Sequence, residues 1–144
     1  MWRKLIAGCF SSAGFSTGCS DDALDAVERA LGVGLPSDLR AALGESDGVS
    51  GEHELALLWP LARIREDNLL FRSNADFQDL YMPFEHLLFF ADAGNGDQFA
   101  FAIQGTAVRR PDIFAWNHEN DSRTWVAPSL ERYFDWWLSG RIVL

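Results

Sequence analysis

The sequence of 144 residues has the length of one domain, and its 48% hydrophobic and 13% aromatic residues are enough to form a buried core. With 12 basic against 21 acidic residues, the net charge is -9 at pH 7. This charge argues against nucleic acid and anionic membranes as partners, because both bind proteins through cationic side chains. It permits a basic protein partner. We expect residues 1–144 to form a single domain, because no repeat or low-complexity linker interrupts them.

The segment from Leu5 to Cys9 resembles the cleavage box of a bacterial lipoprotein. A signal peptide needs an apolar stretch of about 7–15 residues before its cleavage site. Only Leu5 to Gly8 separate Lys4 from Cys9, so we expect this resemblance to be accidental. Cys9 and Cys19 fit neither a disulfide framework nor a zinc pattern, and no run of about 20 apolar residues is present. We therefore expect a cytoplasmic protein with reduced thiols.

The first third of the chain predicts two short helices. Apolar residues recur at three- and four-residue spacing over 21–31, and Ser20 is placed to cap the start of this helix. A second helix follows Pro36, with Ser37 as its cap, and ends before the turn pair Asp47-Gly48.

The rest of the chain changes to strand patterns, with one further helix at its end. Residues 87–91 are continuously apolar, as in a strand covered on both faces, whereas residues 99–103 alternate with a period of two. Asn95-Gly96 between them is typical of a tight hairpin turn with positive φ at both residues. The predicted elements are strands at 55–59, 87–91, 99–103, 112–116 and 123–127, a segment of mixed helical character at 61–70, and a helix opened by Pro128 and Ser129.

This order of elements predicts an α+β fold, with one antiparallel sheet of about four to six strands covered by N-terminal helices and a C-terminal helix. If the last four strands pair consecutively, their first and third connections lie at the same end of the sheet. Asp92 and Asp97 would then approach Glu119 and Asp121. We expect these four carboxylates to be solvated and to form an acidic end of the domain.

No pattern in the sequence indicates a catalytic, metal or cofactor site. His53, His86 and His118 lack the spacing of zinc ligands, and no nucleophile or phosphate-binding motif is present. Most aromatic residues lie on predicted buried faces. Trp59 and Trp116 lie near the ends of elements, and tryptophan is common at interaction hot spots, so we expect them to contact a partner.

Several motifs, distributed over nearly the whole chain, resemble those of one protein family. They are Ala30-Leu31-Gly32, Leu35-Pro36, Asp47-Gly48, Trp59-Pro60-Leu61, Asn68, Met82-Pro83-Phe84, Leu87 to Asp92, Gly94 to Ala100, Trp116, His118-Glu119 and Ser129-Leu130 through Trp137. In this order and spacing they resemble the SUKH superfamily, also called the Smi–Knr type. The resemblance implies an α+β domain used in bacteria mostly as an immunity protein, which neutralises a cognate toxin, often a nuclease or deaminase. Fungal relatives act in cell-wall regulation, and no shared catalytic residue is implied.

From the resemblance and the acidic charge we expect a binding protein that forms a stoichiometric complex with a basic toxin. In this interpretation the four carboxylates and the two tryptophans contact the toxin and block access of its substrate. The alternative is a scaffold or regulatory interaction module without a toxin partner. The neighbouring gene discriminates between them, because a toxin domain encoded immediately upstream favours immunity.

Overall fold

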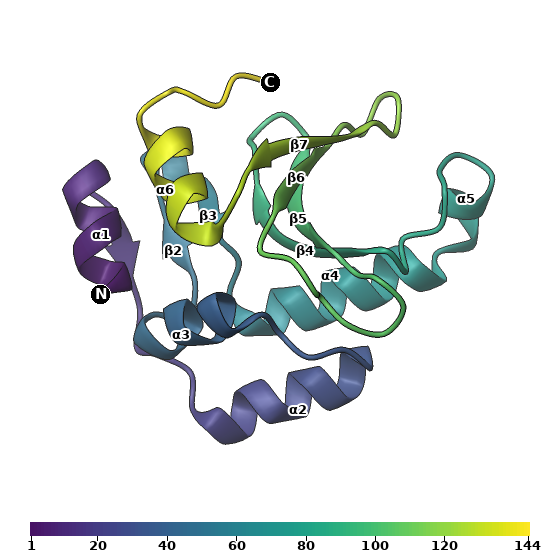
Figure 1. The fold of residues 1–144 in the computed structure, drawn as a ribbon, viewed down its shortest axis with the longest axis horizontal. Coiled ribbons are helices and arrows are strands. Elements are labelled where there is room, and N and C mark those ends of the chain that lie inside the picture. Colours follow the sequence, from purple (N-terminus) through teal and green to yellow (C-terminus); the bar gives the residue numbers. More distant parts are fainter.

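Seven strands form two antiparallel sheets, and six α-helices pack around them (Figure 1). The computed structural model describes residues 1–144. In chain order the elements are α1 (Trp2–Cys9), β1 (Gly14–Phe15), α2 (Asp21–Leu31), α3 (Ser37–Glu45), β2 (Val49–Ser50), the 3-10 turn η1 (Glu52–Glu54), β3 (Ala56–Leu58), α4 (Leu61–Ser73), α5 (Ala75–Gln78), β4 (Leu87–Asp92), β5 (Gln98–Ala102), β6 (Ile113–Trp116), β7 (Arg123–Ala127) and α6 (Leu130–Leu138).

The predicted α+β class is confirmed, but the strands are divided between two sheets. The three-stranded sheet has the order β1-β2-β3 and the four-stranded sheet the order β4-β5-β6-β7, so the last four strands pair consecutively as predicted. Trp59, directly after β3, donates a backbone hydrogen bond of 2.7 Å to the carbonyl oxygen of Phe90 in β4. This bond holds the two sheets side by side.

Helices cover both faces of the four-stranded sheet. On one face the ring of Tyr133 from α6 lies 5.2 Å from that of Phe90 and 4.9 Å from that of Phe99. On the other face the ring of Phe71 from α4 lies 5.1 Å from that of Phe89. The continuously apolar run of β4 is therefore buried from two sides, which confirms the prediction for this strand.

The predicted helix boundaries are correct for α2 and wrong by one residue for α3. The hydroxyl of Ser20 accepts a hydrogen bond of 3.2 Å from the backbone of Ala23, as expected of an N-cap. Ser37, predicted to cap α3, is instead its first helical residue. Pro36 occupies the cap position, and no side chain caps this helix.

Helix α1 was not predicted, and it contains the segment Leu5–Cys9 that resembles a lipoprotein cleavage box. The side chains of Trp2 and Ile6 are buried in the core. The carboxylate of Glu45 accepts backbone hydrogen bonds of 3.0 Å from both Trp2 and Arg3, which satisfies donors at the start of the helix. None of the helices is both long enough and apolar enough to cross a membrane.

The connection between β4 and β5 differs from the predicted two-residue turn. It is a wider loop closed by a 2.9 Å hydrogen bond from the backbone of Ala93 to the carbonyl oxygen of Asp97. Positive φ occurs at Gly94 and Gly96, whereas Asn95 has no positive φ, so the predicted turn type is wrong. The side-chain oxygen of Asn95 accepts a 3.0 Å bond from the backbone of Asp97, which fixes the loop locally.

Candidate partner-binding site

The first and third connections of the four-stranded sheet meet, as the strand order requires. We call the surface formed by residues 93–97 and 117–122 the turn surface. Oδ1 of Asp97 accepts a 3.1 Å hydrogen bond from the backbone of His118 and lies 2.7 Å from Nδ1 of the His118 ring. The predicted approach of the two connections is therefore confirmed.

Asp97 is a structural part of this surface and is not solvated as expected. Its side chain is only 8% exposed. Burial would raise the pKa of Asp97, but hydrogen bonds from His118 and Asn95 outweigh this effect and hold the pKa below its ordinary value. The carboxylate thus stays charged and joins one turn to the other.

Asp121 joins the second turn to the segment before β4. Its Oδ2 accepts a 2.8 Å hydrogen bond from the backbone of Met82, and its Oδ1 accepts 2.8 Å and 3.1 Å bonds from the indole of Trp116 and the guanidinium of Arg123. These bonds outweigh burial and lower the pKa of Asp121. At 12% exposure, this side chain is not solvated either.

Asp92 is the third paired carboxylate, and its partners come from the segment after β3. Arg63 of α4 donates hydrogen bonds of 2.7 and 2.8 Å to its two oxygens, and the indole of Trp59 donates a third of 3.1 Å. The guanidinium of Arg63 lies 4.1 Å from the centre of the Trp59 ring and also binds Asp67. Burial would lower the pKa of Arg63, but the two carboxylates outweigh it and raise the pKa.

Glu119 is the only one of the four predicted carboxylates whose side chain is exposed and forms no hydrogen bond or ion pair. Its backbone N–H donates a 2.8 Å bond to the side chain of Asn117, which holds the turn that presents it. The expectation of a solvated acidic end is therefore correct for Glu119 and wrong for the other three. Asp92, Asp97 and Asp121 form hydrogen bonds because they lie where the two connections meet other segments of the fold.

The two tryptophans expected to contact a partner lie in the core. Trp59 is 0% exposed and Trp116 is 4% exposed. Each uses its indole N–H to bind one of the paired carboxylates, Asp92 or Asp121. In the free protein these rings are therefore not available at the surface, and they act on it by positioning the carboxylates.

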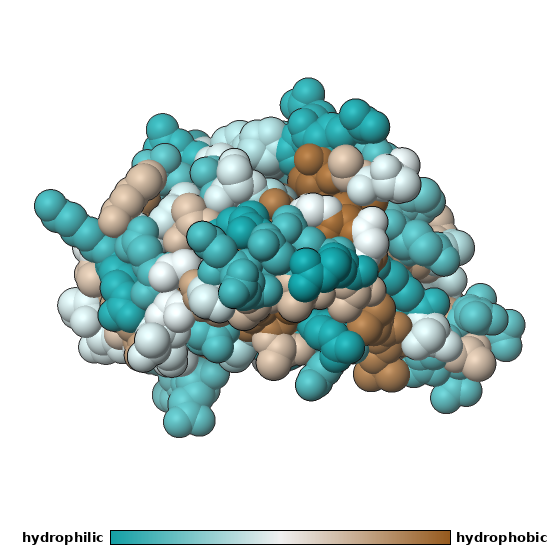
Figure 2. Space-filling view, turned by 90° about the horizontal axis from the view of Figure 1, so that it is seen from below, coloured by the Kyte–Doolittle hydropathy of each residue, from teal (hydrophilic) through white to brown (hydrophobic).

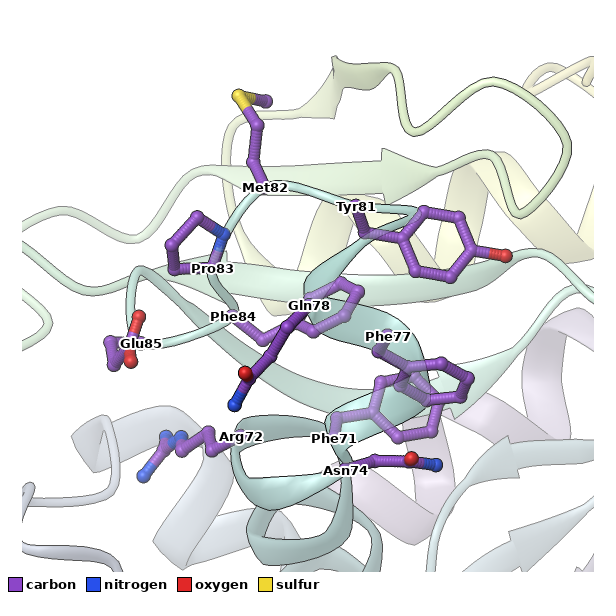
Figure 3. A pocket seen from close by; sticks show the side chains of 10 residues that line it. All are labelled: Phe71, Arg72, Asn74, Phe77, Gln78, Tyr81, Met82, Pro83, Phe84 and Glu85. Atoms are coloured by element: carbon purple, nitrogen blue, oxygen red, sulfur yellow. The ribbon is translucent and has the colours of Figure 1, made fainter.

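An aromatic pocket that the sequence did not predict borders the turn surface. It has a volume of about 180 Å³ and lies between the end of α4, α5 and residues 81–85 (Figure 3). The guanidinium of Arg123 donates bonds of 3.0 and 2.9 Å to the carbonyl oxygens of Pro83 and Met82, which fixes this wall against the turns. Met82-Pro83-Phe84, a motif of the family resemblance, was the signal that could have drawn attention to it.

One exposed apolar side chain, Met82, lines the pocket, and two others, Leu70 and Leu80, directly precede its lining residues Phe71 and Tyr81 in the sequence. Leu70, Leu80 and Met82 are 53%, 68% and 58% exposed. The surface seen from the side of α2 is mostly hydrophilic, with apolar side chains gathered in separate patches (Figure 2). Large exposed apolar residues beside a pocket are typical of surfaces that bind other molecules.

The thiols of Cys9 and Cys19 are not activated as nucleophiles. Burial raises the pKa of Cys9, and burial together with Asp47 raises the pKa of Cys19 to about 12, so both thiols stay protonated at neutral pH. Both are free of disulfides. No group of three or more His, Cys, Asp or Glu side chains lies close enough to hold a metal ion.

A comparison with protein-family models matches most of the chain to one family. The model of the SMI1 / KNR4 family (SUKH-1) matches residues 18–136. The chain belongs to this family. The matched region runs from just before α2 into α6, and it includes the turn surface and the aromatic pocket. A comparison with curated proteins found no significant match.

Proposed function

We propose that the protein is a non-enzymatic immunity-type protein that neutralises a cognate bacterial toxin by forming a stoichiometric complex. Membership of the SUKH-1 family supports this class of function. The observation that carries the proposal is the pair of carboxylates Asp97 and Asp121, which fix the two turns, while the Glu119 side chain on the second turn stays exposed. A surface held in one arrangement loses little conformational entropy when a partner binds.

The proposed interface contains residues that position the surface and residues that contact the partner. Asp92, Asp97 and Asp121 position the surface, as do the indoles of Trp59 and Trp116 behind them. The contacts to the partner come from Glu119 and from neighbouring exposed apolar side chains, chiefly Leu80 and Met82. The apolar contacts set the dissociation rate, because desolvated anchors dominate binding energy.

The partner proposed is a basic protein. With a net charge of -9, the chain attracts a cationic partner over a distance and thereby raises the association rate. The same charge disfavours nucleic acid and anionic membranes as ligands. A basic toxin face bound at the turn surface is covered and cannot reach its substrate, so inhibition requires no chemistry from this chain. We place this encounter in the cytoplasm.

The test begins with the gene immediately upstream, which the proposal expects to encode a toxin domain, and co-expresses that domain with this protein. The wild-type protein is expected to restore growth to cells that express the toxin domain. Glu119→Lys combined with Met82→Glu is expected to abolish rescue, since both side chains are exposed and their replacement leaves the fold intact. Glu131→Lys is the matched control. It reverses the charge of an exposed side chain on α6, at the end of the sheet opposite the turn surface, and should rescue fully. Absence of rescue by the wild type would contradict the proposal and favour a scaffold or regulatory module.

A further inference from the structure

Several asparagine side chains of the protein form the same local contact, an Asx turn, in which Oδ1 accepts a hydrogen bond from the backbone N–H two residues later. They are Asn74, Asn95, Asn117 and Asn120. This contact folds the side chain over the peptide bond that follows the asparagine, and so brings its amide carbon Cγ towards the next backbone nitrogen. Attack of that nitrogen on Cγ is the first step of asparagine deamidation. The residue after each asparagine therefore decides how readily it reacts.

Asn95 differs from the other three in the nitrogen that faces its side chain. Gly96 has no Cβ to hinder the approach, it is exposed, and its backbone N–H donates no hydrogen bond. Asn120 is the closest comparison, because it is also exposed and lies in the other connection of the turn surface. The nitrogen after it belongs to Asp121, which carries a side chain and donates a 2.8 Å bond to the carbonyl oxygen of Asn117.

Asp97 holds the amide of Asn95 with two groups that favour this reaction. Its backbone N–H donates a 3.0 Å bond to Oδ1 of Asn95, where negative charge develops when Cγ becomes tetrahedral. Its Oδ2 accepts a 3.3 Å bond from Nδ2, the atom that leaves as ammonia. Hydrogen bonds from His118 and Asn95 lower the pKa of Asp97 despite its burial, so a negative charge is present to stabilise the departing nitrogen as it takes up a proton.

We propose that Asn95 is a site of spontaneous deamidation that modifies the turn surface. The nitrogen of Gly96 loses its proton and bonds to Cγ of Asn95, the bond from Cγ to Nδ2 breaks, and Nδ2 takes up a proton and leaves as ammonia. Water then opens the resulting succinimide ring at either carbonyl carbon, which leaves an aspartate or an isoaspartate at position 95. This inference goes beyond toxin binding and does not depend on it.

The product is expected to weaken the contact between the two turns. In place of the N–H donor to Asp97, position 95 then carries a second carboxylate of like charge. The other oxygen of Asp97 lies 2.7 Å from Nδ1 of His118, in the contact that joins the two connections. Repulsion at Asp97 should therefore loosen residues 117–122 as the protein ages.

Mass spectrometry that locates deamidated residues in the full chain, incubated at neutral and at mildly alkaline pH, tests the reaction. Asn95 is expected to gain the mass of an amide-to-acid conversion, faster at the higher pH because the Gly96 nitrogen must lose its proton. Asn120, which has the same exposure and the same Asx contact, should react many times more slowly. Asn95→Gln keeps an amide but requires a larger ring, so position 95 should keep its mass.

Three results would overturn the assignment of the site. They are no mass gain at Asn95, an equal gain at Asn120, and a reaction at Asn95 that is far slower in the folded protein than in the full chain unfolded with guanidinium chloride. The last result would mean that the fold holds Gly96 away from the amide carbon.

Asn95→Asp carries the aspartate product from the start and tests the consequence. Amide hydrogen exchange of residues 117–122 should be faster in this variant, and in the deamidated fraction of the wild type separated by its extra negative charge, than in fresh wild-type protein. Asn95→Gln, which adds no charge, is the control and should exchange more slowly than Asn95→Asp. Exchange that is the same in the fresh and the deamidated protein would overturn the proposed effect on the turn surface.

Discussion

The hydroxyl of Tyr81 donates a 2.8 Å hydrogen bond to the carbonyl oxygen of His118. This bond joins the wall of the aromatic pocket to the turn between β6 and β7, across 37 residues of sequence. His118 in turn binds Asp97 in the other connection. The pocket and both turns therefore form one connected structure, and a change in one part is expected to reach the others.

Tyr81→Phe tests this connection. The ring of Tyr81 packs 5.2 Å from that of Trp116, and phenylalanine keeps that contact, so the change removes only the hydroxyl. We expect the free energy of unfolding to fall by about 1 kcal/mol, the usual contribution of one hydrogen bond. Amide hydrogen exchange of residues 117–122 should become faster than in the wild type. Unchanged exchange in this turn would show that the bond does not hold it.

Phe101→Ala tests the packing of the four-stranded sheet. The side chain is 1% exposed, and its ring lies 4.9 Å from that of Phe90 on the face covered by α6. We expect a loss of about 3–5 kcal/mol in the free energy of unfolding, measured in urea, because a cavity replaces the ring. Phe77→Ala, at a half-buried position, should cost clearly less. A loss at Phe101 no larger than at Phe77 would contradict this packing.

Gly96→Ala tests the close approach of the two turns. Gly96 has φ of 96°, and an added Cβ would lie 2.8 to 3.0 Å from atoms of the His118 ring. Gly105→Ala is a matched control, since its φ is 71° and a Cβ there meets nothing within 4 Å. We expect about 1–2 kcal/mol of backbone strain at Gly105 and a larger loss at Gly96. Equal losses would mean that the contact with His118 is unimportant.

Asp121→Asn tests the charged state of the second turn through its pH dependence. Hydrogen bonds lower the pKa of Asp121 in the folded protein below its ordinary value of 3.8, despite burial. Below about pH 4 the unfolded chain therefore binds more protons than the folded protein, and stability falls with pH. The variant should be less stable at neutral pH, and its deficit should shrink as the pH falls below about 4.

Chemical denaturation at a series of pH values measures this change. Asp79→Asn replaces an exposed carboxylate that forms no hydrogen bond or ion pair, and it should follow the wild-type curve. A deficit of Asp121→Asn that is the same at every pH would contradict the prediction, because it would mean that the loss does not come from the charged form.

The sequence predicted the parts of the fold that local patterns encode. Apolar periodicity located α2 and the four strands of the second sheet, and Asn95-Gly96 marked the connection between β4 and β5. Consecutive pairing of these strands then placed the first and third connections at one end of the sheet, where the structure shows Asp97 in contact with His118. These inferences succeeded because each depends on neighbouring residues and on one simple rule of topology.

The partners of the acidic side chains could not be predicted in this way. Asp92 binds Arg63 from 29 residues away, and the backbone of Met82 binds Asp121 from 39 residues away. No local pattern encodes such contacts. Carboxylates that bind distant segments of the chain were therefore expected to be solvated. The aromatic pocket was missed for the same reason, because its walls come from α4, α5 and the segment before β4.

Calorimetric titration of this protein with a purified toxin domain, identified by sequencing the gene immediately upstream, tests the central claim most directly. We predict one toxin domain bound per chain, with an affinity that falls as salt is added. Glu119→Lys should reduce the affinity, whereas Glu131→Lys at the far end of the sheet should not. No heat of binding at either of two well-separated temperatures, or an affinity equally reduced by the two variants, would contradict binding through the turn surface.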